Sequence, residues 1–583
     1  MRNFVTRWAM CGVLGVACAD GSMRSAMAKD HFLAIGGGYD ASGNPASLER
    51  DLKFASATIA ANSTTPAAAA NGAPKQAVEI YFADGNDPAR DVQYVDQAAA
   101  KACPPLVRVL AELFGAPDAV AFRYRDHTLE GVVGPTDYDV MERRFQELSR
   151  ELASGDRLFV IAAGHGGEAI DRAAEEMKEP GEAEHDATAD PAGGESDERN
   201  EDDAIDGDDE DASFNPYDTS LLLWNQDELL ASELCRWLDE LPRDVEVVLV
   251  MGQCYSGGFA NVIFNEADAK LGLSPAARSG FFSQLYDRPA AGCAADLDDE
   301  DVHEYSSYFW AALGGKTRDG TAVTADFDKS GAVSLAEAHA YAVIESDTLD
   351  VPVRTSEALL RVFSRLGGPF ELQEGPMPGA VTDEGIAEGN AAGDSTPSDD
   401  ANSELREPRG PLAQLSALAR PDQRAILEQL PAKIGGMPLG TVEDVRVELG
   451  AALEKVDDAN DALDRAMTTT DEALIVAQNE VYAAWPELHF RESTAAAELL
   501  AAQGEQIAAR VEAMGSYVTL LTTREQEKKL TADADAAEAT AARLERLLRT
   551  VEDIVLAENL NAVAPAEIVT RYEQLVQMEE RGL

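Results

Sequence analysis

Two reactive side chains follow short apolar runs in this chain. The run from Leu158 to Ala163 leads into His165, and the run from Val245 to Met251 leads into Cys254. Each run is rich in branched apolar residues and is closed by glycine, which is typical of a buried parallel strand that ends in a tight turn. Because ligands bind outside the carboxyl ends of strands in open α/β sheets, we expect the imidazole and the thiol to meet in one crevice.

A cysteine beside a histidine can cleave an amide or an ester. The thiolate is the attacking form, and a neighbouring imidazole lowers the thiol pKa and can return a proton to the leaving group. Glycine turns allow backbone N–H groups to approach a developing oxyanion, and we expect Gly166 and Cys254 to supply them. The alternative is a structural cysteine, since free cysteine is among the most often buried residue types. Two strand ends flanked by glycine favour catalysis.

Strands and helices alternate along the part of the chain that must position this pair. Such alternation predicts an α/β fold, with a mostly parallel sheet flanked by helices. The predicted strands lie near residues 31–36, 77–83, 119–125, 158–163, 219–224, 245–251 and 279–286, and the predicted helices near 46–60, 97–115, 136–153, 227–241, 257–269 and 303–314.

The order of these motifs resembles that of the clan CD cysteine peptidases, which include caspases, metacaspases, legumains and gingipains. The region from His31 to about Leu366 is similar to bacterial caspase-like proteins near the legumain group, on segments 31–39, 215–224, 253–258 and 280–293. The resemblance implies a caspase-like fold and an endopeptidase acting on proteins or peptides through His165 and Cys254, without an organic cofactor. The Cys254 turn matches neither the caspase nor the usual legumain sequence, so no substrate preference follows.

An acidic insert over residues 168–212 separates the two candidate catalytic residues. His165 lies farther from Cys254 than the roughly 50 residues typical of caspases, and the insert accounts for the excess. Its density of Asp and Glu with few bulky apolar residues predicts disorder. An activation linker or a calcium-responsive cover is the functional alternative.

Asp287 and Arg288 follow the strand after Cys254, where clan CD enzymes commonly line the pocket for the residue before the cut. An acidic pocket residue would favour basic substrates and an arginine would favour acidic ones. An ion pair between the two neighbours is the alternative.

A second motif, over residues 326–337, has the spacing of a twelve-residue EF-hand loop. A glycine stands at position 6, and a lone loop of this kind predicts structural or low-affinity Ca²⁺ binding. The alternative is a capping box at the start of the next helix, made by Ser334 and Glu337. The candidate ligands are Asp326, Asp328, Ser330, Ala332 through its carbonyl, Ser334 and Glu337.

The first residues have the pattern of a signal peptide over 1–28. Arg2 and Arg7 precede a short apolar run, and Ala26 to Ala28 offers a cleavage site. This pattern predicts a secreted or periplasmic protein, while lipid attachment through Cys18 is the less favoured alternative. No later run is long and apolar enough to predict a membrane span.

The composition narrows the range of partners. The 583-residue chain carries a formal net charge of −58, which disfavours binding to nucleic acid or to an anionic membrane surface. Beyond the signal region, Cys103, Cys235, Cys254 and Cys293 have neither zinc-ligand spacing nor the density of a disulfide framework.

Three further regions complete the predicted organisation. The peptidase domain would span residues 29–371, and a linker rich in Pro, Gly, Ser and acidic residues covers 372–411. Residues 412–583 have helical spacing and predict an all-α bundle or coiled coil for self-association or partner binding. Two functions follow: an exported cysteine endopeptidase, or a catalytically idle scaffold that acts through these helices.

Overall fold

The computed structural model describes residues 28–62, 77–170, 214–292, 304–367, 405–436 and 438–583. The predicted signal peptide up to residue 27 lies outside the described residues. So do nearly all of the acidic insert, Cys293, and the predicted linker up to residue 404.

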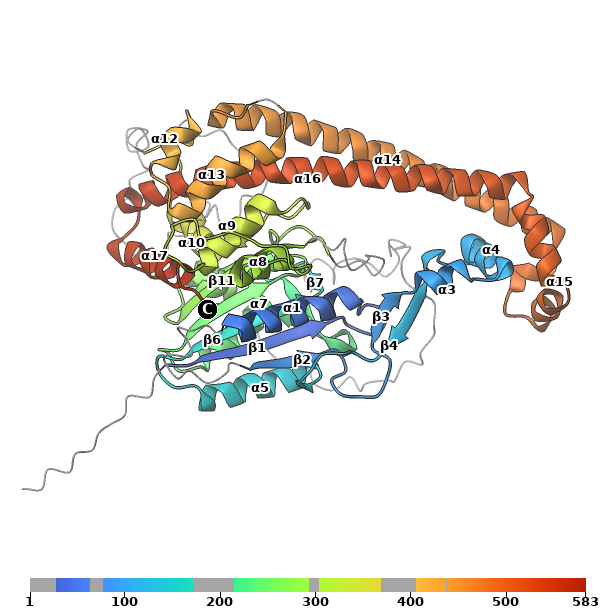
Figure 1. Ribbon diagram of the computed structural model, residues 1–583, viewed down its shortest axis with the longest axis horizontal. Coiled ribbons are helices and arrows are strands. Elements are labelled where there is room, and N and C mark those ends of the chain that lie inside the picture. The colour runs from blue at the N-terminus through green and yellow to red at the C-terminus, as the bar shows by residue number, and fades with distance from the viewer. Residues whose placement is uncertain (1–27, 63–76, 171–213, 293–303, 368–404, 437) are drawn as a thin grey trace, which may run out of the picture.

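The centre of the fold is a seven-stranded sheet with the order β12-β11-β10-β6-β1-β2-β5 (Figure 1). All neighbours are parallel except β12, which runs antiparallel to β11. The predicted α/β fold with a mostly parallel sheet is therefore confirmed. The strands are β1 (Asp30–Gly37), β2 (Val78–Phe82), β5 (Val132–Gly134), β6 (Arg157–Gly164), β10 (Glu246–Met251), β11 (Ala277–Phe282) and β12 (Val353–Arg354).

Both faces of this sheet are covered, which explains why its inner strands are continuously apolar. In β6, Leu158 and Val160 face one buried cluster, while Phe159 and Ile161 face the other. Helices α5 (Tyr138–Glu151) and α7 (Ala231–Asp239) pack on the first face. The second face is covered by α1 (Ala46–Asn62), α8 (Tyr305–Gly314) and α9 (Leu335–Glu345).

Two predicted strands lie outside the main sheet. β4 (Phe122–Arg125) pairs with β3 (Val92–Val95), and β8 (Ser220–Leu222) pairs with β7 (Gly166–Gly167) and β9 (Glu228–Leu230). Local alternation finds a strand but does not identify its partner.

Two predicted helices also differ from the observed elements. The helix expected over 97–115 is divided into α3 (Gln97–Lys101) and α4 (Pro105–Phe114), because the adjacent prolines Pro104 and Pro105 remove backbone donors. The helix expected over 257–269 is a 3₁₀ segment, η3 (Ser256–Ile263), followed by two shorter 3₁₀ turns, η4 (Asn265–Ala267) and η5 (Ala269–Leu271).

The C-terminal region is helical, as predicted. Helices α14 and α16 run side by side as a long pair, and α15 lies at the far end of that pair (Figure 1). Among the described helices, none combines the length and apolar character that a membrane crossing requires. The helices are α12 (Leu412–Ser416), α13 (Pro421–Ile434), α14 (Val442–Ala484), α15 (Thr494–Glu512), α16 (Gly515–Val563) and α17 (Ala566–Glu579).

This helical region packs against the sheet region at both ends. At one end, Leu544 and Val551 of α16 share a core with Val343 of α9; at the other, Ile507 of α15 shares one with Val109 of α4. The two regions therefore form one packed structure, although the sequence predicts separate units.

Buried ionic groups stabilise the interface between the helical region and the sheet region at the end near α9. Arg354, at the start of α10 (Thr355–Phe363), lies 2.7 Å from the carboxylate of Asp422, and both side chains are buried. The carboxylate of Glu579 in α17 accepts hydrogen bonds from the Thr355 hydroxyl and from the amide and hydroxyl of Ser356. A side chain of the helical region thus caps a helix of the sheet region.

Candidate active site

The two reactive residues follow neighbouring parallel strands. Met251 of β10 pairs with Ala162 of β6, so the turns carrying Cys254 and His165 leave the same edge of the sheet. A Cβ atom built on Gly166 would lie 2.0 Å from the carbonyl oxygen of Cys254, a distance that no side chain tolerates. The two turns are in direct contact, and glycine is required where they meet.

The imidazole of His165 is held by a third loop, between β1 and α1. Its Nε2 lies 2.8 Å from the carbonyl oxygen of Gly43. A carbonyl can only accept, so Nε2 carries the proton and the neutral ring keeps Nδ1 as an acceptor. Burial lowers the pKa of His165, although the Gly43 hydrogen bond and the charge of Asp40 act in the opposite direction. A neutral imidazole at pH 7 suits a general base.

Asp40 shapes the turn that presents this carbonyl. Its Oδ1 accepts hydrogen bonds from the Ser42 amide at 2.8 Å, the Ser42 hydroxyl at 2.6 Å and the Gly43 amide at 2.9 Å. An aspartate bonded in this way to its following residues is a common turn-forming device. Asp40 therefore acts on His165 through both the turn and its charge.

The same loop is closed by Asn44 and by a tight backbone contact. The Asn44 Oδ1 accepts from the Gly38 amide at 3.1 Å, and a Cβ atom on Gly38 would lie 1.7 Å from the Gly43 oxygen. The ring of Tyr39 packs 5.6 Å from that of His165. No role in the site was predicted for these residues, although a glycine run after a strand, followed by Asp, Ser and Asn, is a visible signal in the sequence.

The thiol of Cys254 is bordered by an irregular segment after β11. The Ala290 amide donates to Sγ at 3.1 Å, and the Tyr255 amide donates to the Arg288 oxygen at 3.0 Å. A donor on the sulfur stabilises the thiolate more than the thiol. Tyr255 has a positive φ of 57°, so the residue directly after the nucleophile adopts a left-handed conformation.

The amide of Gly166, an expected oxyanion donor, is not part of the neighbouring β-ladder. The Leu222 amide donates to the His165 oxygen, which makes His165 and Leu222 a hydrogen-bonded pair of the β7–β8 ladder. Such pairs alternate with non-bonded ones in antiparallel ladders, so the amide of Gly166 points away from β8. The ladder therefore leaves this donor unused.

Gln253, just before the nucleophile, is fully buried. Within the part of the chain that the structure describes, neither its side-chain oxygen nor its nitrogen has a hydrogen-bond partner. An unsatisfied buried amide costs about 1–3 kcal/mol, and such groups call for an explanation in function or bound water. No role of its own was predicted for Gln253 from the sequence.

The expected pair of Asp287 and Arg288 is a weak contact, with 3.8 Å between the Asp287 carboxylate and the Arg288 Nε. The main partner of Arg288 is Glu545 of α16, which it meets through both terminal nitrogens at 2.7 and 3.1 Å. The guanidinium charge is therefore already paired. Asp287, within the segment that borders the thiol, keeps a half-exposed carboxylate.

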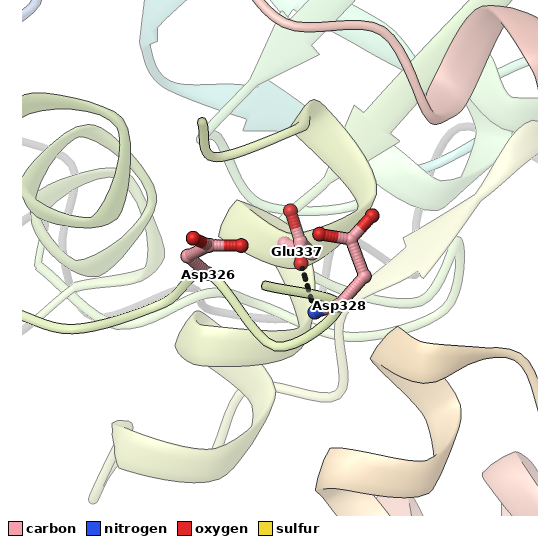
Figure 2. A group of neighbouring side chains, drawn as sticks. All are labelled: Asp326, Asp328 and Glu337. Atoms are coloured by element: carbon pink, nitrogen blue, oxygen red, sulfur yellow. Dashed lines mark hydrogen bonds between the residues drawn. The ribbon is translucent and has the colours of Figure 1, made fainter. Parts of the chain in front are cut away.

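The EF-hand-like loop brings its acidic side chains together (Figure 2). One carboxylate oxygen each from Asp326, Asp328 and Glu337 lies within 4.8 Å of the others. Gly331 has a positive φ of 93°, which permits the sharp turn. The hydroxyl of Ser330 donates to the Ala332 carbonyl at 3.0 Å.

In this loop Glu337 is engaged by the protein itself. Its Oε1 accepts from the amides of Phe327 and Asp328 at 2.7 and 2.9 Å, and its Oε2 accepts from the Ser334 amide at 2.9 Å. The Ser334 hydroxyl accepts in return from the Glu337 amide, so the capping box is formed. A cation fits this donor set only if Glu337 gives up some of these bonds.

Comparisons with known proteins give no assignment. No family model matches the chain, and no curated protein matches it. Among solved structures, the crystal structure of protein GSU0716 from Geobacter sulfurreducens is 11% identical with a TM-score of 0.23, covering 49% of this chain and 81% of that one.

The described cysteines other than Cys254 lie away from this site. Cys235 belongs to α7 and is buried in the core, where burial raises its thiol pKa to about 12, and Cys103 lies between α3 and α4. In the described ranges none of Cys103, Cys235 and Cys254 forms a disulfide.

Proposed function

We propose that this protein is a caspase-like cysteine endopeptidase in which Cys254 is the nucleophile and His165 the general base and acid. The observation that carries the proposal is the contact between the two turns, with Gly166 against the Cys254 carbonyl and the Gly43 oxygen fixing the His165 ring. Alignment of a thiol and an oriented imidazole at one sheet edge is the arrangement that thiol-dependent acyl transfer needs.

The reaction follows from these positions. Nδ1 of His165 takes the thiol proton, and Sγ of Cys254 attacks the peptide carbonyl while backbone amides, with that of Gly166 among them, stabilise the oxyanion. The C–N bond then breaks as His165 returns the proton to the leaving amine. Water, deprotonated by His165, hydrolyses the thioester and releases the second product and the thiol.

Asp287 contributes a carboxylate to the substrate pocket in this proposal, from the segment that borders the thiol, and it favours a basic residue before the cut. The charge of Arg288 is paired with Glu545, which leaves Asp287 as the pocket charge. Substitution Asp287→Asn should then lower cleavage after Lys or Arg relative to cleavage after apolar residues.

Two accessory properties belong to the same proposal. Export through residues 1–28 would bring the enzyme to the periplasm or medium, where free Ca²⁺ is abundant enough for a weak site. Asp326, Asp328 and Glu337 would hold that ion, with the Ala332 carbonyl and the Ser330 and Ser334 hydroxyls as further oxygen donors. Its role there is to stabilise the loop.

A peptide-library digest tests the activity. Wild-type protein with Ca²⁺ should cleave peptides, and Cys254→Ala and His165→Ala should each lower the rate by at least about 10³-fold, since members of a catalytic pair act as a unit. Cys103→Ala, outside the site, is the matched control and should retain full activity. Cleavage that survives Cys254→Ala, or a folded wild type that cleaves nothing, would reject the proposal in favour of a scaffold.

A further inference from the structure

The segment that borders the thiol has no regular structure of its own. Residues 283–292 form neither helix nor strand, yet the Ala290 amide and the Arg288 oxygen fix Sγ of Cys254 and the amide of Tyr255. An irregular segment keeps such positions only through outside contacts. Its supports therefore determine where the thiol lies.

The first support is the ion pair between Arg288 and Glu545. Both terminal nitrogens of the guanidinium meet both carboxylate oxygens, at 2.7 and 3.1 Å. This bidentate geometry fixes direction as well as distance, which a single point contact does not. Glu545 belongs to α16, about 290 positions after Cys254 in the chain.

The second support begins at the next residue of α16, the buried Arg546. Its guanidinium donates to the carbonyl oxygens of Ser346, Thr348 and Asp350 at 2.8, 2.7 and 2.5 Å. These carbonyls belong to the loop after α9, residues 346–352, which forms neither helix nor strand. The single side chain of Arg546 thus holds three carbonyl groups of that loop in place.

The loop after α9 in turn contacts the segment beside the thiol at two points. The Asp350 Oδ1 accepts from the Ala291 amide at 2.8 Å. The Gln284 side chain accepts from the Val351 amide at 3.0 Å and donates to the Pro289 oxygen at 3.0 Å. Contacts therefore run without interruption from Arg546 to the residues on both sides of Ala290.

We propose that Glu545 and Arg546 of α16 are positioning residues for Cys254, so that the C-terminal helices form part of the catalytic apparatus. The inference rests on the proposed peptidase function. Loss of either support releases the Ala290 amide from Sγ, which removes a donor that favours the thiolate. The thiolate then lacks this hydrogen bond, and attack at neutral pH becomes slower.

The test is the rate of Cys254 alkylation by iodoacetamide across pH 5 to 10 in the full chain, followed by peptide mass mapping. Glu545→Arg and Arg288→Glu should each slow alkylation about tenfold at pH 7 and move its midpoint to higher pH, because each leaves two like charges facing each other. The double exchange, which restores an opposite pair, should recover most of the rate. Glu525→Arg, an exposed site on the same helix, is the control and should match wild type.

If a charge-reversal variant does not fold, the milder variants Glu545→Gln and Arg546→Lys replace it in the same alkylation measurement. Thermal unfolding checks that each variant is folded. Alkylation profiles identical to wild type in these variants and in the reversals that fold would overturn the inference, as would a double exchange no faster than the singles. A wild type that alkylates as expected without cleaving peptides would reject the peptidase function alone. Full peptidase activity in Glu545→Arg would reject the positioning role alone.

Discussion

The two members of the proposed dyad follow adjacent strand ends but are held by different parts of the chain. His165 is fixed by the β1–α1 loop, where Asp40 shapes the turn that offers the Gly43 carbonyl. Cys254 is bordered by a segment whose contacts lead to Glu545 and Arg546 in the C-terminal helices. The histidine can thus be oriented by the sheet region alone, whereas the thiol depends on docking of the helical region.

The docking interface offers the largest effect. Asp422→Asn leaves the buried Arg354 without its closest carboxylate, and we expect a loss of about 3–5 kcal/mol in the free energy of unfolding. Chemical denaturation measures it, with the exposed Asp471→Asn on α14 as control. In the folded variant, alkylation of Cys254 should change more than the titration of His165. Equal changes in Cys254 alkylation and in His165 titration would contradict the view that the two residues are held by different regions.

Acid provides an independent check on the same pair. Although burial opposes ionisation, Arg354 and Arg420 lower the pKa of Asp422 to about 2. A carboxyl with a depressed folded pKa contributes stability above its ordinary pKa of about 4, and that contribution, about 2 kcal/mol, is lost as pH falls towards 2. Asp422→Asn should lack this part of the acid dependence.

The next largest effect is expected where the turns that carry His165 and Cys254 touch. Gly166→Ala places a methyl group against the Cys254 carbonyl, which must move, and we expect about a 100-fold fall in kcat/KM. Because both members are displaced, histidine titration and thiol alkylation should change together. Gly134→Ala, where a Cβ would meet Tyr81 at an ordinary 3.4 Å, is the control. Unchanged activity in Gly166→Ala would show that the turns do not need their close approach.

The histidine side should respond to Asp40 in two separable ways. Asp40→Ala removes the acceptor that shapes the turn, and we expect about a tenfold loss of kcat. Asp40→Asn keeps an oxygen acceptor but removes the charge that raises the His165 pKa, so the acid limb of the pH–rate profile should move to lower pH. A limb that moves to higher pH, or a slower Cys254 alkylation at high pH, would contradict the assignment.

The smallest effect is expected from calcium, because the loop over 326–337 supports neither member of the dyad directly. At Ca²⁺ about ten times its dissociation constant, binding should add about 1.4 kcal/mol of stability. Thermal unfolding with and without Ca²⁺ measures it, and Asp328→Asn should remove the response. A change in the pH–rate profile without a change in stability would contradict a purely structural site.

The sequence was sufficient for the two strands that precede His165 and Cys254 and for the contact of the turns that follow them, and the reasons are physical. The runs before His165 and Cys254 are continuously apolar because both faces of β6 and β10 are buried. The positions of Glu545, Arg546 and Glu579 as supports could not be predicted, since a charged helix residue that pairs with a distant segment has the same local pattern as one that faces solvent. The spacing around Glu337 predicts either a calcium ligand or a member of a capping box. The hydrogen bonds with Ser334 establish the capping role.

The central claim is that His165 activates the thiol of Cys254. Its most direct test is labelling of the full chain by a thiol-reactive peptidyl probe at pH 7, with mass mapping of the modified cysteine. The account predicts that Cys254 is labelled in wild type, at a rate at least about 100-fold above that in a folded His165→Ala variant. Equal labelling in the two proteins, or preferential labelling of Cys103, would contradict it.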